Sequence, residues 1–372
     1  METLVQNVMS ITGGQIFMML VGALLMYLGI KKEYEPTLLV PMGLGTILVN
    51  FPGTGVLDQV VGGQQQHGVL QILFEIGIET ELFPLLIFIG IGAMIDFGPL
   101  LQNPFMLLFG AAAQFGIFVA FFLSVMWGMT PQEAASVGII GGADGPTALF
   151  LTTRLAPHLL PAIALAAYSY MALVPIIQPP IIRALTTKKE RLVKMTENRK
   201  VSETEKILFP IIVTIFVSLL VPSATPLVGC LMLGNLIKEI KVVPNITKVL
   251  QNAMMYGVTI ILGLTVGAKA TGELFLSVST LKITLLGLIA FAGGTAAGVL
   301  MGKLMYKLSG GKINPMIGAA GVSAVPMAAR VVQKEGQREG PSNYLLMHAM
   351  GPNVAGVIGS AIAAGGLLAF FS

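Results

Sequence analysis

The sequence contains little charge, and this shortage excludes most soluble folds. Only 11% of its 372 residues are Asp, Glu, Lys or Arg, whereas 55% are hydrophobic. Soluble domains carry about 25% charged residues and about 45–50% apolar ones. The mean hydropathy of +0.84 therefore indicates a protein that lies in a lipid bilayer. A chain of this length allows about ten to twelve membrane segments of about 20 residues each.

Residue types that support redox chemistry or metal binding are also scarce. A single cysteine, Cys230, excludes an internal disulfide and a cysteine-based metal cluster. The three histidines, His67, His158 and His348, show no metal-binding spacing. The chain has no GxxxxGK[ST], GxGxxG or HExxH motif, which argues against an autonomous nucleotide-driven pump. The net charge of +4 does not indicate nucleic acid, because the basic residues lie in loops beside apolar segments.

Glycine and proline are abundant instead, at 44 and 21 residues, as in membrane bundles with close helix contacts and broken helices. Because the first ten residues lack a basic region, we expect the first apolar stretch to be a retained span rather than a signal peptide. The sequence predicts an all-α polytopic membrane protein. Its apolar segments cover residues 14–30, 36–51, 82–95, 104–128, 133–153, 156–182, 207–221, 225–240, 254–268, 282–306, 313–332 and 343–371.

The most charged stretch, residues 183–206, lies at the middle of the chain and separates two halves that resemble each other. Short motifs recur in the same order at offsets of 175 to 189 residues: 44–47 with 233–236, 91–93 with 266–268, and 142–144 with 321–323. Tyr170 falls near Asn353 in this alignment. Such internal similarity predicts two membrane repeats, residues 1–182 and 207–372, joined by a basic cytoplasmic linker.

The Lys and Arg residues indicate how the repeats are oriented, because cytoplasmic loops carry most of them. If all twelve segments cross the membrane, 14 basic residues lie inside and 8 outside. If residues 133–153 and 313–332 each enter and leave on one side, the division becomes 19 to 3. The second arrangement is favoured. It predicts inverted repeats with about ten crossings, two re-entrant hairpins and both chain ends outside.

Both predicted hairpins contain residues that break a helix. Pro146 interrupts the first, and Pro315 and Pro326 interrupt the second, each beside several glycines. Irregular backbone persists at membrane depth only where protein or water satisfies its polar groups. The carbonyl groups that it frees are ready ligands for a cation.

Asp144 is the most informative residue, because only three aspartates occur and it alone lies well inside a re-entrant segment. A carboxylate there is energetically costly and usually functional. It offers a hard oxygen to a small cation such as sodium, and it can take up a proton instead. The alternative is an ordinary cap for the half-helix that begins beside Gly145 and Pro146.

Other polar residues at the breaks add to this pattern. Asn314, Ser323 and Asn353 offer neutral oxygens, and with the aspartate they form a predicted ligand set. Each is also a common turn or cap former. Tyr170 adds a hydroxyl or is an ordinary buried or interfacial tyrosine. Arg330, at the end of the second hairpin, can bind a carboxylate in bidentate fashion or serve only as a positive-inside residue.

At these motifs the sequence resembles the beta subunits of the sodium-ion-translocating biotin-dependent decarboxylases. This family comprises the oxaloacetate, methylmalonyl-CoA, glutaconyl-CoA and malonate decarboxylase pumps. The most specific stretches are Gly-Gly-Ala-Asp-Gly-Pro-Thr at 141–147 and Gln-Pro-Pro at 178–180. The resemblance extends over nearly the whole chain and includes 90–100, 168–177, 314–326 and 351–356.

The resemblance implies a membrane subunit that decarboxylates carboxybiotin and couples this reaction to sodium export and proton uptake. It implies the cell inner membrane as the location, a homo-oligomer as one form of assembly, and biotin-carrier, carboxyltransferase and small membrane subunits as partners. It also assigns a role to particular residues. These are Asp144, Asn314, Ser323 and Asn353 for the sodium site, Tyr170 for a proton pathway, Gly318 for close packing, and Arg330 for the carboxybiotin entry.

Two other functions are possible interpretations of the sequence, and they explain its residues unequally well. Inverted repeats with re-entrant hairpins serve a stand-alone sodium-coupled transporter of a small solute equally well. A non-enzymatic scaffold of a membrane complex does not explain a carboxylate at a helix break. The identity of the decarboxylated acid belongs to the carboxyltransferase partner and is not encoded in this chain.

Overall fold

The computed structural model describes residues 9–61, 64–195 and 200–372. Residues 1–8 and residues 196–199 of the predicted linker lie outside the described residues. Six described helices are long and apolar enough to cross a membrane: Gly13–Lys32, Pro104–Met126, Pro157–Leu185, Pro244–Ala268, Val278–Leu308 and Leu346–Phe371. The predicted helical membrane protein is confirmed, whereas the number of crossings stays a prediction.

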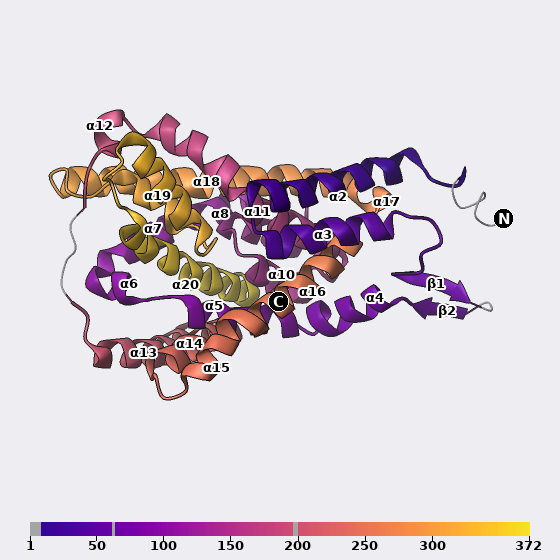
Figure 1. Cartoon of the computed structure of the whole chain (residues 1–372), viewed down its shortest axis with the longest axis horizontal. Helices are drawn as coiled ribbons and strands as arrows, with labels where there is room; N and C mark the ends of the chain where they lie inside the picture. The colour runs from indigo at the N-terminus through magenta and orange to yellow at the C-terminus, as the bar shows by residue number, and fades with distance from the viewer. Residues whose placement is uncertain (1–8, 62–63, 196–199) are drawn as a thin grey trace.

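The predicted apolar segments coincide with helices along nearly the whole chain (Figure 1). The first half contains α2 (Gly13–Lys32), α3 (Pro36–Val49), α5 (Leu82–Met94), α6 (Gly98–Gln102), α7 (Leu107–Ala113), α8 (Phe115–Met126), α9 (Pro131–Gly138), η3 (Ile139–Gly142), α10 (Gly145–Leu155) and α11 (Leu160–Leu185). The second half contains α13 (Glu203–Leu220), α14 (Thr225–Glu239), α15 (Pro244–Lys248), α16 (Met255–Ala268), α17 (Gly272–Phe275), α18 (Val278–Leu308), η7 (Pro315–Gly321), α19 (Met327–Glu339) and α20 (Leu346–Phe371).

Residues 52–81 carry structure that the apolar pattern did not predict. Strands β1 (Asp58–Val61) and β2 (Gln64–His67) pair in antiparallel fashion, with Asp58 opposite His67. Helix α4 (Val69–Phe74) and the π-helical turn η1 (Glu75–Glu79) follow. The strands have four residues each and are largely polar, so hydrophobic periodicity gives no signal for them. The hairpin lies at the same end of the molecule as α17 (Figure 1).

Both segments predicted as re-entrant are broken helices. The first consists of α9, η3 and α10, and its chain turns at Ala143, which has a left-handed φ of 56°. Helices α9 and α10 have 8 and 11 residues. At 1.5 Å per residue neither spans the roughly 30 Å of a bilayer core. In the second segment an irregular stretch, residues 322–326, separates η7 from α19.

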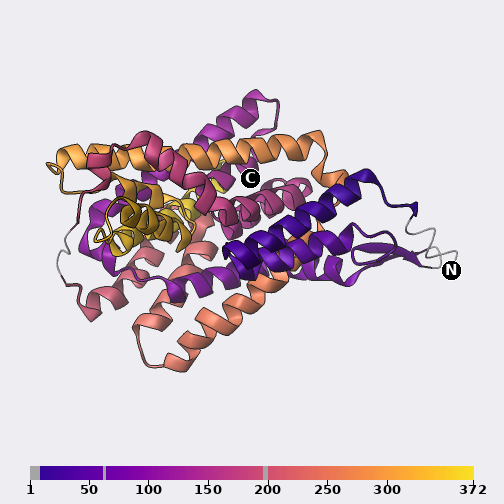
Figure 2. The same ribbon diagram turned by 45° about the horizontal axis from the view of Figure 1, so that its top comes forward.

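The long helix α18 supports both broken segments. It packs against η3 and η7, and also against α8 and α11. Figure 2 shows α18 running along one side of the molecule, with the second broken segment next to its C-terminal half. The breaks therefore lie among helices of both halves rather than at the lipid-facing surface.

The two halves pack on each other through equivalent glycines. A Cβ at Gly45 of α3 would lie 2.2 Å from the Leu264 carbonyl oxygen of α16, and one at Gly267 would lie 2.0 Å from the Met42 oxygen. Helices α5 and α14 make the matching contact. There a Cβ added at Gly92 would lie 1.8 Å from the backbone of α14, and one added at Gly234 would lie 1.9 Å from the backbone of α5.

Two polar residues, Thr46 and Asn235, make equivalent contacts between the halves. The Thr46 hydroxyl donates to the Gly267 carbonyl oxygen at 3.2 Å, and the Asn235 amide donates to the Gly92 carbonyl oxygen at 3.3 Å. Thr46 and Asn235 follow the glycines that the repeat alignment equates. Each half thus contributes the same elements to two matching helix pairs.

The central linker is tied to α19. Its short helix α12 (Lys188–Arg191) follows α11. Arg183 forms a bidentate ion pair with Glu335, with both N···O distances 2.6 Å, and the Arg191 Nε lies 2.8 Å from Glu339. These contacts fix the helix that carries Arg330 relative to the end of α11.

Candidate functional site

Asp144 lies at the break between η3 and α10 and is 5% exposed. It is the N-cap residue of α10, and its Oδ1 accepts a hydrogen bond from the Thr147 backbone N–H at 3.2 Å. Pro146 suits the first turn of this helix because the backbone donor that it lacks has no partner there. The capping role considered for Asp144 is therefore present. It uses only one of the two carboxylate oxygens.

The second oxygen of Asp144 connects the two broken segments. Its Oδ2 accepts a hydrogen bond from the Ser360 hydroxyl of α20 at 2.8 Å. Ser360 in turn accepts one from the Ser323 hydroxyl at 3.0 Å. The Ser323 backbone N–H also donates to the Gly142 carbonyl oxygen at 2.9 Å. Asp144 and Ser323, predicted from equivalent repeat positions, thus lie together.

Asn353 also lies at the second break. Its Nδ2 donates to the carbonyl oxygens of Ala320 and Val322 at 3.0 and 2.8 Å. Its Oδ1 is buried and has no hydrogen-bond partner among the described residues. Asn353 therefore holds the irregular backbone in place and leaves one amide oxygen free. A free buried oxygen needs a partner, and a cation can be that partner.

Gln114 is a further polar residue at this place and is not among the predicted site residues. It lies between α7 and α8, where its Nε2 donates to the carbonyl oxygens of Gly110 and Gly356 at 3.1 and 3.3 Å. Its Oε1 is buried without a partner among the described residues. A Cβ at Gly142 would lie 3.4 Å from this oxygen. Gln114 thus places a free oxygen beside the first break.

The structure places Asn314 elsewhere. Its Nδ2 donates to the carbonyl oxygens of Arg191 and Val193 at 3.0 and 2.8 Å, and its Oδ1 accepts from the Met316 N–H at 3.0 Å. Asn314 thus caps η7 and anchors it to the linker. No hydrogen bond among the described residues joins it to the cluster around Asp144, and its role as a sodium ligand stays a prediction.

Gly318 allows η7 to touch α18 directly. A Cβ at Gly318 would lie 1.9 Å from the Gly298 carbonyl oxygen, and a Cβ at Gly298 would lie 2.1 Å from the Gly318 oxygen. Such a reciprocal backbone contact admits no side chain on either residue. The close contact is present, and the functional role that the resemblance assigns to Gly318 stays a prediction.

The two tyrosines of α11 face different neighbours. The Tyr170 hydroxyl donates to the backbone oxygen of Thr284 in α18, and no hydrogen bond among the described residues links it to Asp144. Tyr168, which is not among the predicted site residues, lies against the first break, since a Cβ at Gly145 would lie 2.5 Å from its ring. Its hydroxyl is buried without a partner in the described part of the chain.

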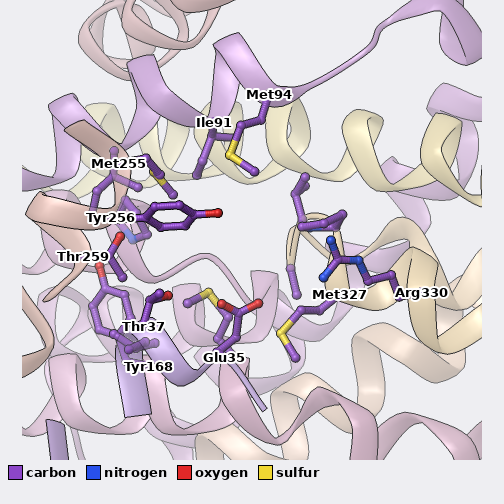
Figure 3. Close-up of a pocket in the computed structure, with 17 residues that line it drawn as sticks. Glu35, Thr37, Ile91, Met94, Tyr168, Met255, Tyr256, Thr259, Met327 and Arg330 are labelled. Carbon is purple, nitrogen blue, oxygen red and sulfur yellow. The ribbon is translucent and has the colours of Figure 1, made fainter. Parts of the chain in front are cut away.

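A cavity leads from the surface to the two breaks. Its volume is about 170 Å³, which is more than one water needs (about 30 Å³). Arg330 is exposed and stands at one side (Figure 3). Pro146 and residues 324–327 of the two broken segments line it, together with Tyr168. The cavity therefore passes between the segment that carries Asp144 and the one that carries Ser323.

Glu35 is the single carboxylate among the residues that line this cavity. It precedes α3, is half-buried, and has a left-handed φ of 38°. Burial raises the pKa of the Glu35 carboxyl above its ordinary value, and the positive charge of Arg330 lowers it in part. Figure 3 shows the Glu35 carboxylate and the Arg330 guanidinium directed into the cavity from different sides.

The fold and the site define a polytopic helical membrane protein with a carboxylate at the junction of two broken segments. A family model described as "Na+-transporting oxaloacetate decarboxylase beta subunit" matches residues 14–371. The chain belongs to this family, as the motifs had indicated.

Curated relatives support the assignment over almost their full length. The methylmalonyl-CoA decarboxylase subunit beta of Propionigenium modestum is 57% identical, with 96% of this chain and 95% of the relative covered. The glutaconyl-CoA decarboxylase subunit beta of Acidaminococcus fermentans is 56% identical, with 96% and 93% covered. The oxaloacetate decarboxylase beta chain of Klebsiella pneumoniae is 49% identical, with 98% and 96% covered.

Proposed function

We propose that this chain is the membrane subunit of a biotin-dependent decarboxylase, and that it decarboxylates carboxybiotin and couples the reaction to sodium export. The names of its relatives describe beta subunits of decarboxylases, and the family is described as sodium-transporting. The observation that carries the proposal is the position of Asp144. Its carboxylate joins both broken segments beside a cavity that reaches the surface.

The sodium site is formed by oxygens around Asp144. Hard cations prefer carboxylate, hydroxyl and carbonyl oxygens. The carboxylate oxygens come from Asp144, and the hydroxyl oxygens come from Ser360 and Ser323. The carbonyl oxygens are the free amide oxygens of Asn353 and Gln114. The negative charge of Asp144 compensates the cation where little water is present. Asn314 supports this arrangement by anchoring η7.

The cavity couples the chemistry to the ion. Arg330 receives the carboxylate of carboxybiotin, and Pro146 and residues 324–327 place the reaction next to the sodium site. Moving one charge against the membrane potential costs about 2.3 kcal/mol per 100 mV, so the reaction must depend on whether the ion is bound. Decarboxylation consumes a proton. Asp144 links the two events by carrying either sodium or a proton, and Tyr170 belongs to the proton pathway.

We propose inverted repeats with ten crossings and two re-entrant hairpins as the topology. The matching pairs α3–α16 and α5–α14 support a twofold relationship between the halves. The short helices α9 and α10 and the 19-to-3 division of basic residues support the hairpins. Alternating exposure of the site then follows from movement of one part against the other.

A beta subunit belongs to a larger complex, and its partners follow from the chemistry. A biotin-carrier subunit brings carboxybiotin to the cavity, a carboxyltransferase subunit loads it, and a small membrane subunit completes the membrane part. We place the chain in the cell inner membrane, with the linker and Arg330 on the cytoplasmic side, where the basic residues gather.

The test is sodium-dependent decarboxylation of free carboxybiotin by the purified complex reconstituted in vesicles. We expect decarboxylation to require sodium and to move it across the membrane. Sodium-coupled movement of a small solute with no decarboxylation would support the stand-alone transporter instead.

A further inference from the structure

Breaking the bond between the ureido nitrogen of carboxybiotin and its carboxyl carbon leaves an electron pair on that nitrogen as carbon dioxide departs. The nitrogen then takes up a proton, so a donor must reach it inside the cavity. Asp144 is not among the residues that line the cavity, because Pro146 and Tyr168 stand there instead. The last transfer to the nitrogen therefore has to come from a group on the cavity wall, and Asp144 and Tyr170 can only supply the proton to that group.

The lining residues offer few acids. They include two phenols, Tyr168 and Tyr256, two threonine hydroxyls, one guanidinium and one carboxyl, that of Glu35. A free phenol and a free guanidinium hold their protons far above neutral pH. Both are therefore poorly matched to proton transfer near neutral pH, whereas a carboxyl with a raised pKa is well matched.

We propose that Glu35 is the general acid that protonates the ureido nitrogen when the carboxyl group leaves. This inference rests on the proposed function. The Glu35 O–H bond breaks, its proton goes to the nitrogen, and its carboxylate remains to accept the new N–H of biotin. Arg330 holds the departing carboxylate on another side of the cavity. Glu35 then regains a proton through the proposed pathway of Tyr170 and Asp144.

The surroundings of Glu35 suit this role. It also lines an outer cavity, which shares Tyr256 and Arg330 with the first. No ion pair within 4.0 Å joins Glu35 to Arg330 among the described residues, which leaves space for a substrate between them. Glu35 has a left-handed backbone conformation at the start of α3, and its carboxylate is directed into the cavity (Figure 3). The titratable and charged groups that line the two cavities with Glu35 are Lys32, Glu33, Tyr34, Tyr168, Tyr256, Arg330 and Lys334.

The pH dependence follows from this role. The active form of a general acid is protonated, so the rate should be highest below the pKa of Glu35 and fall as the pH rises through it. Burial moves this fall toward neutral pH, and Arg330 opposes that shift in part. Biotin binding and sodium binding should not follow the same profile, because they depend on other groups.

The experiment compares Glu35→Gln with the unaltered complex at saturating sodium, with free carboxybiotin as substrate and the spontaneous reaction subtracted. We expect the rate at the acidic end to fall by about 10²- to 10⁴-fold and the decline with rising pH to disappear. Equilibrium binding of biotin and of sodium should stay within about threefold, since a single neutral hydrogen bond contributes little more. Glu33→Gln is the matched control, because Glu33 is exposed and lines only the outer cavity.

Glu35→Asp keeps a carboxyl group, so it should retain the decline of the rate with rising pH at a reduced overall rate. This variant tests the role of the carboxyl if Glu35→Gln does not assemble. A normal rate and pH profile in Glu35→Gln would overturn the assignment. So would a flat profile in Glu35→Asp. An unaltered complex that does not decarboxylate free carboxybiotin at all would instead contradict the proposed function itself.

Discussion

The Ser360 hydroxyl lies 2.8 Å from the Asp144 carboxylate, although 216 residues separate them in the chain. This hydrogen bond joins the first broken segment to α20, and Ser323 joins the second segment to the same hydroxyl. Ser360 therefore occupies the centre of the proposed sodium site. It is fully buried, so bulk solvent does not reach it.

We expect Ser360→Ala to weaken apparent sodium affinity by about 10- to 100-fold, because a hydrogen bond to a charged group contributes about 1.5–3 kcal/mol. Turnover should recover in part at high sodium, since the carboxylate remains. Sodium titration of the decarboxylation rate measures both effects. Ser223→Ala is the control, because Ser223 also donates to the backbone of α20, at Gly365, without contacting the site. Unchanged sodium affinity in Ser360→Ala would remove this residue from the site.

Asp144 could be predicted as a site residue from the sequence, whereas Ser360 could not. A carboxylate beside Gly-Pro inside an apolar segment has few explanations, so Asp144 could be selected directly. Ser360 lies in an uninterrupted apolar helix, where a single hydroxyl is common and forms no pattern. Gln114 lies in the predicted apolar segment 104–128 without a motif, and only the fold shows that its oxygen faces Gly142.

The sequence also did not show which residues that are far apart in the chain lie together in the fold. The helices followed from apolar segments, and the breaks followed from Pro146 and Pro326. The surroundings of Asn314 depend on the linker backbone at Arg191 and Val193, and no local pattern specifies that contact. Glu35 belongs to no sequence motif, and only the cavity shows that it lies near Arg330.

Arg330→Ala should raise the KM for free carboxybiotin by at least about tenfold, because charge-assisted hydrogen bonds to a carboxylate are strong, and leave sodium affinity nearly unchanged. The guanidinium carries a permanent positive charge and cannot bind sodium. Parallel measurement of KM and sodium affinity separates the two effects. Arg338→Ala provides the control, since Arg338 is an exposed arginine of the same helix. Equal losses in both quantities would place Arg330 in the ion site.

Gly318→Ala should strongly reduce activity, because its Cβ would lie 1.9 Å from the Gly298 oxygen and push η7 away from α18. Overpacking of this kind costs about 1–3 kcal/mol or more. Thermal unfolding of the purified complex and its sodium affinity report the displacement. Gly293→Ala on α18 is the comparison, since its nearest neighbour would lie 3.9 Å away. Normal activity and unfolding temperature in Gly318→Ala would show that the contact adjusts easily.

The proposed topology predicts which loops accept a label from each side. In a Cys230→Ser background, Lys189→Cys should react only from the cytoplasm and Lys282→Cys only from outside, and both side chains are exposed. A membrane-impermeant thiol reagent on oriented vesicles makes the measurement. Labelling of both positions from one side would contradict the inverted arrangement.

Asp144→Asn should abolish sodium transport and coupled decarboxylation while the protein still folds and inserts. Asparagine preserves the cap, because an amide oxygen accepts the Thr147 N–H as well as a carboxylate does. It cannot offset the charge of a bound cation, and it cannot exchange a proton. Loss of a carboxylate from a buried ion site costs several kcal/mol, which is far more than an altered cap.

Two measurements separate the roles of Asp144. The unfolding temperature and membrane yield of Asp144→Asn should stay near those of the unaltered chain, and sodium binding should be undetectable. Asp144→Ala removes the cap as well, so it should lower stability further without a greater loss of sodium binding. Near-normal sodium-dependent activity in Asp144→Asn would mean that the carboxylate is only a cap, and the coupling mechanism would have to be abandoned.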